Sequence, residues 1–327
     1  MTQSTVLILG ANGRLGSALV AAFSDGVWRV IAQSRSLGAA RSAHSVIADT
    51  RDVDHVVKSA RALGRVDVVI HAANVIYKRW ASEAIALNDA SLSIAKALGA
   101  TLMLPGNVYN FGTDMPEALR SNTPQNAHHA QTSKGTIRVN MERALAAAAE
   151  RGTQALVIRA GDFFGCGVGS WFDQAIAKDV QKGKLTYPGP LSHVHTWAYV
   201  PDLAATFVRV AEARQTLARF ETIHFAGYAV TGYEFVQSMQ RVMQRTLNVS
   251  GLPWWLIRTL GVVKPAWRDL AEMSYLWQRP HRLVTSTAHA HLMAPTTPLE
   301  RALQQSLATL YPRLLCATPS ASPAVAG

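Results

Sequence analysis

The N-terminal stretch "VLILGANGRLGSAL" constrains the fold more than any other part of the chain. An apolar run suited to a buried strand leads directly into Gly10, Gly13 and Gly16, and a helical pattern follows. Glycines at this spacing permit a tight turn, close approach of the backbone to a pyrophosphate, and tight packing of helix on strand. The helix N-terminus adds free N–H groups and positive dipole. We therefore expect a dinucleotide to bind at this loop.

Short β-branched runs alternate with helical stretches from this loop onwards, for example "WRVIAQS", "DVDHVVKSARAL", "VDVVIHAA" and "QALVIRA". Such alternation indicates βαβ units and a parallel sheet. We predict an α/β fold with a doubly wound Rossmann sheet of about six strands. Residues 1–160 are expected to form this NAD(P)-binding domain.

The pattern changes after residue 160 to loops rich in Gly, Pro and aromatic residues, which favours a pocket over a sheet. We expect residues 161–316 to form a smaller α+β substrate-binding region. It is partly interleaved with the first domain through an extra strand and helix at 222–246, where Thr231 and Glu234 have the spacing of a capping box. Residues 317–327 are small and Pro-rich, and a disordered tail is predicted there.

Composition narrows the range of partners. The formal charge of +11 comes from scattered arginines without a basic run, so we expect an anionic small molecule and no nucleic acid. The apolar stretch "LPWWLIRTLGVV" is interrupted by Arg258 and is shorter than the roughly 20 residues of a spanning helix, so no membrane partner is expected. Cys166 and Cys316 lie far apart, and no leader pattern opens the chain, which favours a cytoplasmic protein.

The end of the second strand, "WRVIAQSRS", indicates which dinucleotide binds. A carboxylate there would accept hydrogen bonds from a ribose 2′-hydroxyl, but the sequence has Ser34 and Arg35, and Arg14 follows the second loop glycine. Two cations would attract a 2′-phosphate. NADP(H) is therefore favoured over NAD(H), although two merely exposed arginines would leave NAD possible.

Several further motifs, in their order along the chain, resemble the extended and atypical short-chain dehydrogenase/reductase superfamily, in its NAD-dependent epimerase/dehydratase branch. They are "GANGRLG", "ADTRD", "VDVVIHAAN", Asn88 in "ALNDASLSIAKAL", "NVYNFG", "RAGDFFGCG" and "HTWAYVPDLA". The resemblance implies a homodimer formed through the Asn88 and Lys134 helices. It also implies cofactor contacts from Gly10, Asn12, Gly13, Arg14, Leu15, Gly16, Ser34, Arg35, Asp49, Thr50, Ala72, Ala73, Asn74 and Lys134.

The sequence departs from this family at the catalytic centre. The resemblance implies a Ser or Thr and a Tyr at two positions that here hold Pro105 and Ala130, and only Lys134 of the proton-transfer group remains. A lysine one helical turn from a tyrosine helps the phenol to ionise. Without the phenol, the lysine ammonium can still donate to the nicotinamide ribose and hold the cofactor in place.

Another group must then transfer the proton. Tyr109, His129, His193 and His195 are possible, because a histidine titrates near neutrality, but each is equally consistent with a structural role. We name Lys134, Tyr109 and His129 as candidate catalytic residues. The candidate substrate contacts are Asn107, Asp162, Trp171 and His195.

Two functions are consistent with these features. The first is an NAD(P)-dependent oxidoreductase or epimerase-like enzyme with a substituted acid, which acts on a small molecule. The second is an NADP(H)-binding sensor or scaffold without turnover. Metal chemistry is not expected, because "HVH" and "HAH" lack nearby carboxylate or cysteine ligands at a recognisable spacing.

Overall fold

The computed structural model describes residues 3–38, 44–75, 79–121, 123 and 131–313. The predicted tail at 317–327 and the candidates His129 and Ala130 lie outside these residues. No helix of the described part is both long and apolar enough to cross a bilayer. Within the same ranges, no group of three or more His, Cys, Asp or Glu could hold a metal ion.

A parallel sheet of seven strands forms the centre of the molecule, in the order β11-β7-β5-β4-β1-β2-β3. This confirms the predicted doubly wound Rossmann fold, with one strand more than expected. The strands are β1 (Thr5–Leu9), β2 (Arg29–Ser34), β3 (His44–Ile47), β4 (Val68–His71), β5 (Thr101–Gly106), β7 (Ala155–Arg159) and β11 (Phe220–His224).

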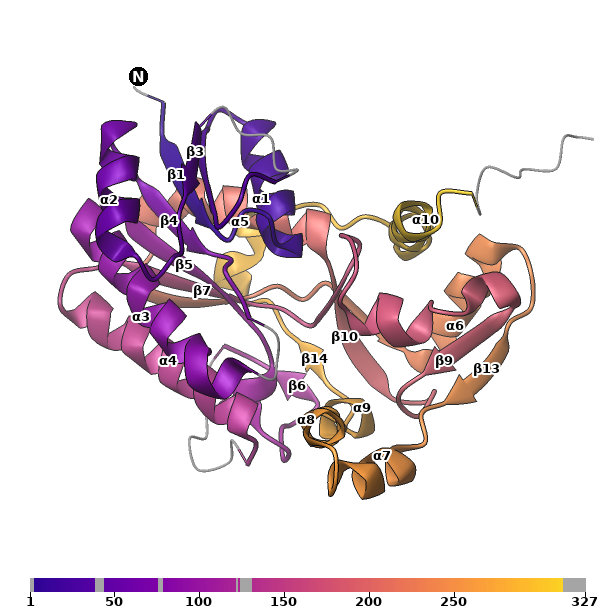
Figure 1. Cartoon of the computed structure of the whole chain (residues 1–327). Coiled ribbons are helices and arrows are strands. Elements are labelled where there is room, and N and C mark those ends of the chain that lie inside the picture. Colours follow the sequence, from indigo (N-terminus) through magenta and orange to yellow (C-terminus); the bar gives the residue numbers. More distant parts are fainter. Residues whose placement is uncertain (1–2, 39–43, 76–78, 122, 124–130, 314–327) are drawn as a thin grey trace, which may run out of the picture.

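Helices cover both faces of this sheet (Figure 1). One face packs against α1 (Arg14–Ser24) and α5 (Val200–Ala213), and the other against α2 (Val53–Ala62), α3 (Trp80–Leu98) and α4 (Ser133–Glu150). Strands buried on both faces need apolar side chains in both directions, which explains continuous apolar runs such as Val6 to Leu9.

The second part of the chain surrounds a separate apolar cluster that includes Trp197, Phe235 and Trp277. Its helices are α6 (Gly232–Met243), α7 (Trp254–Gly261), α8 (Pro265–Glu272), α9 (Tyr275–Gln278) and α10 (Leu299–Leu310). Short helical turns are η2 (Tyr109–Phe111), η3 (Phe172–Ile176), η4 (Val180–Lys182), η5 (Arg214–Thr216) and η6 (Thr287–Leu292). β11 returns to the main sheet beside β7, and the division at residue 160 stays a prediction.

Segments expected to be pocket loops include three small sheets. These are β12-β10-β8, β13-β9 and β14-β6, built from β6 (Ala118–Leu119), β8 (Asp162–Phe164), β9 (Lys184–Tyr187), β10 (Val194–Tyr199), β12 (Tyr228–Thr231), β13 (Asn248–Gly251) and β14 (Arg282–Leu283). The expectation of loops in place of sheets was therefore wrong here. The aromatic residues of β10 fill a core, since Trp197 and Tyr199 are both buried.

A buried ion pair joins α4 to the main sheet beneath the site. The Arg159 guanidinium, at the end of β7, is fully buried and donates to both carboxylate oxygens of Glu142 at 3.2 and 2.6 Å. Asn110 also donates to Glu142, and the Nε2 atom of His224 lies 3.2 Å from Arg159. Burial and Arg159 lower the pKa of His224 to about 4, so the imidazole stays neutral beside the cation.

Breaking this pair should strongly destabilise the fold. We expect Glu142→Gln to lower the free energy of unfolding by about 3–5 kcal/mol, because Arg159 would keep a buried charge without a counter-charge. Denaturant unfolding measures this change. Glu150→Gln, at an exposed position on the same helix, is the control and should change stability by less than about 0.5 kcal/mol. Equal stabilities of the two variants would refute a role for the pair.

Candidate active site

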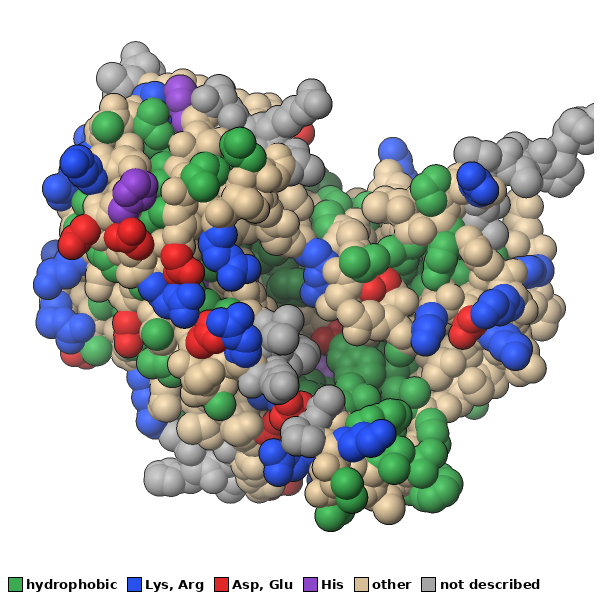
Figure 2. All heavy atoms as spheres, viewed as in Figure 1, with side chains coloured by type: hydrophobic (Ala, Val, Ile, Leu, Met, Phe, Trp, Pro, Cys, Tyr) green, Lys and Arg blue, Asp and Glu red, His purple; other side chains and the backbone are tan. Residues whose placement is uncertain are grey.

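A pocket of about 890 Å³ lies where β1, β4, β5 and β7 reach their carboxyl ends. In Figure 2 the surface is hollowed between the part that carries the main sheet and the part that follows β7. The pocket runs from the glycine loop to α7 and α8, where Ile257, Leu270 and Met273, the residue after α8, line it. Ligands of open α/β sheets bind at this edge, so the pocket is the candidate site.

Close backbone packing shapes the glycine loop. Gly10 has a φ of +78°, and a Cβ there would lie 2.5 Å from the Cα of Ala73. A Cβ on Gly16 would lie 2.2 Å from the carbonyl oxygen of Gly10, so this residue packs α1 on β1 and does not line the pocket. Helix α1 begins at Arg14, and its N-cap, Gly13, makes no side-chain cap bond. The first-turn N–H groups can therefore receive a pyrophosphate, and the loop fits a dinucleotide.

The end of the pocket beside β2 is lined by Ser34, Arg35 and Thr50, three of the residues expected to contact the adenosine half of a cofactor, together with Gln33. The Gln33 side-chain oxygen accepts from the Gly10 amide and the Thr50 hydroxyl, both at 3.0 Å, and its amide nitrogen donates to Ala48 at 2.6 Å. Gln33 was not recognised from the sequence. Its place at the last positions of β2, beside the expected ribose contact, is the signal that could have indicated it.

Asp49 lines the pocket, and its carboxylate is paired with a neighbouring cation. Arg51 donates to both of its carboxylate oxygens at 2.8 Å. These bonds hold the pKa of the Asp49 carboxyl well below its usual range. Arg51 also contacts Glu83 at 3.2 Å and lines the pocket itself. The expected adenine contact of Asp49 would therefore be made by a carboxylate that Arg51 holds in place.

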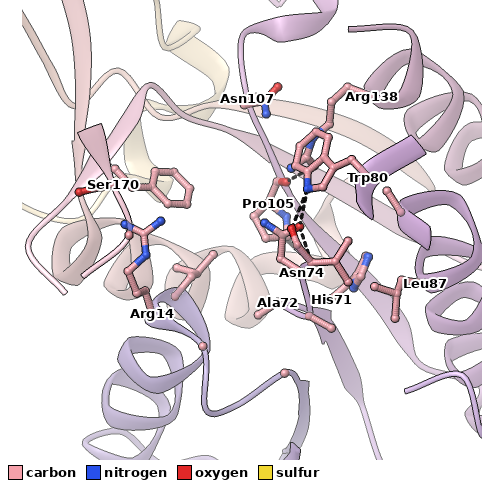
Figure 3. A pocket seen from close by; sticks show the side chains of 18 of the residues that line it. Arg14, His71, Ala72, Asn74, Trp80, Leu87, Pro105, Asn107, Arg138 and Ser170 are labelled. Carbon is pink, nitrogen blue, oxygen red and sulfur yellow. Dashed lines mark hydrogen bonds between the residues drawn. The ribbon is translucent and has the colours of Figure 1, made fainter. Parts of the chain in front are cut away.

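Arg14 projects away from the adenosine end. In Figure 3 its guanidinium points from the start of α1 toward Ser170. A Cβ on Gly169 would lie 3.7 Å from its Nε atom, so the Arg14 side chain lies close to the loop after β8. Arg35 is thus the better placed of the two arginines to meet a 2′-phosphate. Arg14 instead supplies positive charge between the phosphate loop and the substrate side of the pocket.

A second polar group lies beside Pro105, at the end of β5. Arg138 donates to the carbonyl oxygen of Pro105 at 3.0 Å, and its guanidinium lies 4.9 Å from the Trp80 ring centroid. The Trp80 indole in turn donates to the Asn74 side chain at 3.0 Å. Figure 3 shows these four residues gathered on one wall. Neither Arg138 nor Trp80 was predicted, although Arg138 lies one helical turn after Lys134.

His71 lies at the end of β4 and lines the same wall. Burial and the charge of Arg138 lower the pKa of its imidazole to about 3. The ring is therefore neutral at pH 7. Because a strongly depressed pKa leaves no proton to give near neutrality, His71 is unsuited to replace the missing acid.

The substrate end of the pocket carries a carboxylate backed by a histidine. Asp162, the first residue of β8, lines the pocket, and its Oδ2 atom lies 2.9 Å from Nε2 of His195. Trp197 pairs with Asp162 between β10 and β8, so His195, two residues earlier, points to the same face. His195 is buried and stacks on Trp277 with ring centroids 4.1 Å apart. The dyad is therefore held rigidly, with only the carboxylate at the pocket.

The other substrate candidates also reach the pocket. Asn107, Trp171 and Tyr109 line it, and Asn107 accepts a hydrogen bond from the Tyr109 amide at 3.0 Å. His195 and His193 do not line the pocket, although His195 is hydrogen-bonded to Asp162, which does. Of the predicted cofactor contacts, Asn12, Leu15, Ala72, Ala73 and Asn74 line the pocket beside those named above.

Lys134 lies outside the pocket wall, at the start of α4. Its ammonium is 2.5 Å from the Glu272 carboxylate and donates to the Asp269 carbonyl at 3.2 Å. Glu272 also accepts from the amide and hydroxyl of Ser133, at 2.5 and 2.7 Å. The Lys134 side chain is only 3% exposed. Glu272 thus fastens α8, whose Leu270 lines the pocket, to the N-terminus of α4.

Comparisons with known structures agree with this architecture. A UDP-glucose-4-epimerase from Stenotrophomonas maltophila, with bound NAD and formylated UDP-arabinopyranose, superposes with a TM-score of 0.73 at 14% identity, covering 94% of this chain and 98% of the other. An L-threonine dehydrogenase from Phytophthora infestans gives 0.72 at 18% identity, over 94% and 99%. At these identities the likeness establishes the fold.

A third similar structure is a UDP-glucose 4-epimerase from Bifidobacterium longum in complex with NAD+ and UDP, with a TM-score of 0.70 and 15% identity over 94% and 99% of the two chains. None of the curated proteins matches the sequence. The sequence model of the NAD dependent epimerase/dehydratase family, however, matches residues 6–224, which include the glycine loop, Asp162 and the whole main sheet. The chain therefore belongs to the NAD-dependent epimerase/dehydratase family.

Proposed function

We propose that the protein is an NADP(H)-dependent oxidoreductase or epimerase-like enzyme in which Asp162 and His195 transfer the proton. The observation that carries this proposal is the hydrogen bond between a carboxylate at the pocket and a buried imidazole, 2.9 Å apart. A pocket that only held a dinucleotide would not need an acid–base pair at the end away from the glycine loop. Nucleotide sugars, aldehydes and ketones are the substrate classes to test.

The bound nicotinamide would supply or accept a hydride at the reacting carbon. In the reducing direction a carbonyl oxygen must gain a proton. A proton held by the Asp162–His195 pair can supply it: the proton moves from the His195 imidazolium to Asp162 and from Asp162 to the carbonyl oxygen, which leaves a neutral imidazole and an ionised carboxylate. His281 packs against the His195 ring. Burial and His195 lower the pKa of His281 to about 4, so this second ring is neutral and adds no competing charge. Asn107 can orient the polar group of the substrate from the next strand end.

Asp162→Asn tests this assignment, since the amide keeps the shape but carries no transferable proton. We expect kcat for a carbonyl substrate to fall about 10²–10⁴-fold, with the NADPH dissociation constant unchanged. NADPH consumption with a panel of aldehydes, ketones and nucleotide sugars provides the assay. Asp54→Asn, exposed on α2, is the matched control. A fully active Asp162→Asn variant would rule out the dyad.

Preference for NADP(H) rests on Arg35, which lines the adenosine end of the pocket beside Ser34. Among the described residues at the end of β2 no carboxylate is present to repel a 2′-phosphate. Arg51, also at the pocket, adds a second cation from the turn after β3. Because Arg51 is paired with Asp49, Arg35 should contribute more of the discrimination.

NADPH should accordingly bind more tightly than NADH in titration calorimetry. A charged hydrogen bond is worth roughly 1.5–3 kcal/mol, which corresponds to about a tenfold to hundredfold preference. Arg35→Asp should reverse the order by repelling the phosphate. Arg151→Asp, at an exposed position after α4, makes the same charge change far from β2 and should preserve it. Equal affinities in the unmodified protein would contradict NADP(H) use.

The alternative function, an NADP(H)-binding sensor or scaffold, is favoured by one observation. Lys134, the only retained member of the proton-transfer group, is held by Glu272 and Asp269. Donation to a nicotinamide ribose would require the ammonium to leave these partners. Failure to consume NADPH with any member of the substrate panel, together with tight NADPH binding, would support the sensor.

Lys134 and Glu272 can be separated by paired substitutions. We expect Lys134→Met and Glu272→Gln each to lower the free energy of unfolding by about 1.5–3 kcal/mol, and the double variant to lose little more. Lys182→Met, which breaks an exposed pair with Asp179, is the control and should leave the stability almost unchanged. A rise of tenfold or more in the NADPH dissociation constant for Lys134→Met alone would instead indicate that the lysine anchors the cofactor.

The Lys134–Glu272 pair should make the stability of the fold depend on pH. Burial raises the pKa of the Glu272 carboxyl, but hydrogen bonds from Lys134 and Ser133 outweigh it, so the pKa is lowered in the folded state. Its contribution to stability is therefore present above the ordinary carboxyl pKa and is lost as the pH falls through the folded value. Glu272→Gln should flatten this part of the curve of stability against pH.

A homodimer through α3 and α4 is also proposed. The two helices lie side by side on one face of the sheet (Figure 1), and α4 ends in a run of alanines that permits close helix approach. Light scattering should give a mass near twice 35.4 kDa. A monomer at micromolar concentrations would refute the dimer.

A further inference from the structure

Apolar side chains are exposed along α7, α8 and the turn between them. Five of the ten large hydrophobic residues that are exposed in the described part of the chain fall within residues 255–267. They are Trp255 (72% exposed), Leu256 (38%), Val262 (86%), Val263 (80%) and Trp267 (36%). We call the exposed side chains of residues 255–268 the α7–α8 surface. Figure 2 shows hydrophobic side chains gathered over these helices.

Helix α7 is anchored to the protein through its other side. The opposite side of α7 already packs through Trp254 and Ile257, and the Trp254 indole donates to the Pro188 carbonyl at 2.5 Å. Ile257 and Trp267 also line the pocket. Exposed clusters of this kind are costly in water and mark interaction surfaces.

The charged residues within the α7–α8 surface are all basic. Arg258, Lys264 and Arg268 are exposed within the α7–α8 surface. No Asp or Glu occurs in the sequence between Glu234 and Asp269. Arg258 donates to the neutral side chains of Ser274 and Gln278, so its charge is not cancelled by those contacts. The surface therefore combines tryptophan, aliphatic groups and three cations.

The apolar and basic side chains of the α7–α8 surface indicate which kind of partner could bind there. A twofold interface would place the surface against itself, and its three cations would then meet a second surface of the same charge. An anionic lipid surface instead offers negative charge to the cations and an interfacial layer that tryptophan rings favour. The short apolar stretch excludes a spanning helix but not shallow insertion, which needs only one apolar face. We propose that the α7–α8 surface docks the protein on anionic lipid bilayers.

Vesicle sedimentation tests the proposal directly. The full chain is mixed with vesicles of phosphatidylcholine alone, or of phosphatidylcholine with about one third phosphatidylglycerol, at physiological salt. We expect binding to the anionic vesicles and little to the neutral ones. Each basic residue near an anionic surface contributes about fivefold in affinity, so Lys264→Gln should weaken binding about that much and Val263→Glu more.

Val27→Glu is the matched control, because Val27 is 77% exposed and far from α7 in the sequence, and the variant adds the same charge. Both substituted side chains lie in solvent, so folding is preserved, and thermal unfolding verifies it. No binding to anionic vesicles, equal binding to both kinds of vesicle, or equal losses in Val263→Glu and Val27→Glu would each overturn the proposal. So would a Val263→Glu variant that keeps vesicle binding but loses a dimer mass, since the surface would then join protein copies. None of these readouts depends on turnover.

Discussion

The contact between the backbones of Gly10 and Ala73 determines where the pocket can form. Gly10 has no Cβ, so the turn after β1 can lie directly against the end of β4. Helix α1 begins at the same edge of the sheet. The parallel order of the sheet then brings the ends of β5 and β7 beside it. Every polar group of the candidate site, from Gln33 to Asp162, is attached to one of these strand ends or to an element packed on them.

Much of this arrangement could be predicted from the sequence. The glycine spacing, the alternation of strands and helices, and the positions of Ser34, Arg35, Asn107 and Asp162 are local features that hold in any parallel sheet. Each of these four residues lines the pocket. The whole-chain pattern also identified the family correctly, because several loose motifs in one order are specific when taken together.

The contacts that decide the chemistry could not be predicted, because they join distant parts of the chain. Lys134 and Glu272 are 138 residues apart, and nothing in either local sequence indicates that α8 reaches the start of α4. Arg138 was overlooked because its role depends on Trp80 and Pro105, which come from two other elements. The sequence predicts a loop where β10 forms. The aromatic residues of β10 pack in a second core, and the local sequence does not indicate that core.

The ion pair of Lys134 also bears on where proton transfer can occur. A buried ammonium normally makes the electrostatic potential around it more positive, which stabilises a nearby phenolate and so helps a phenol to ionise. Here the Glu272 carboxylate lies 2.5 Å away and neutralises that potential. A phenol restored at position 130 would gain little from such a lysine. In the proposed mechanism proton transfer instead occurs at Asp162, which lines the pocket and is hydrogen-bonded to the His195 imidazole. The ion pair between Lys134 and Glu272 therefore supports the proposal that the acid–base group belongs to β8 and not to α4.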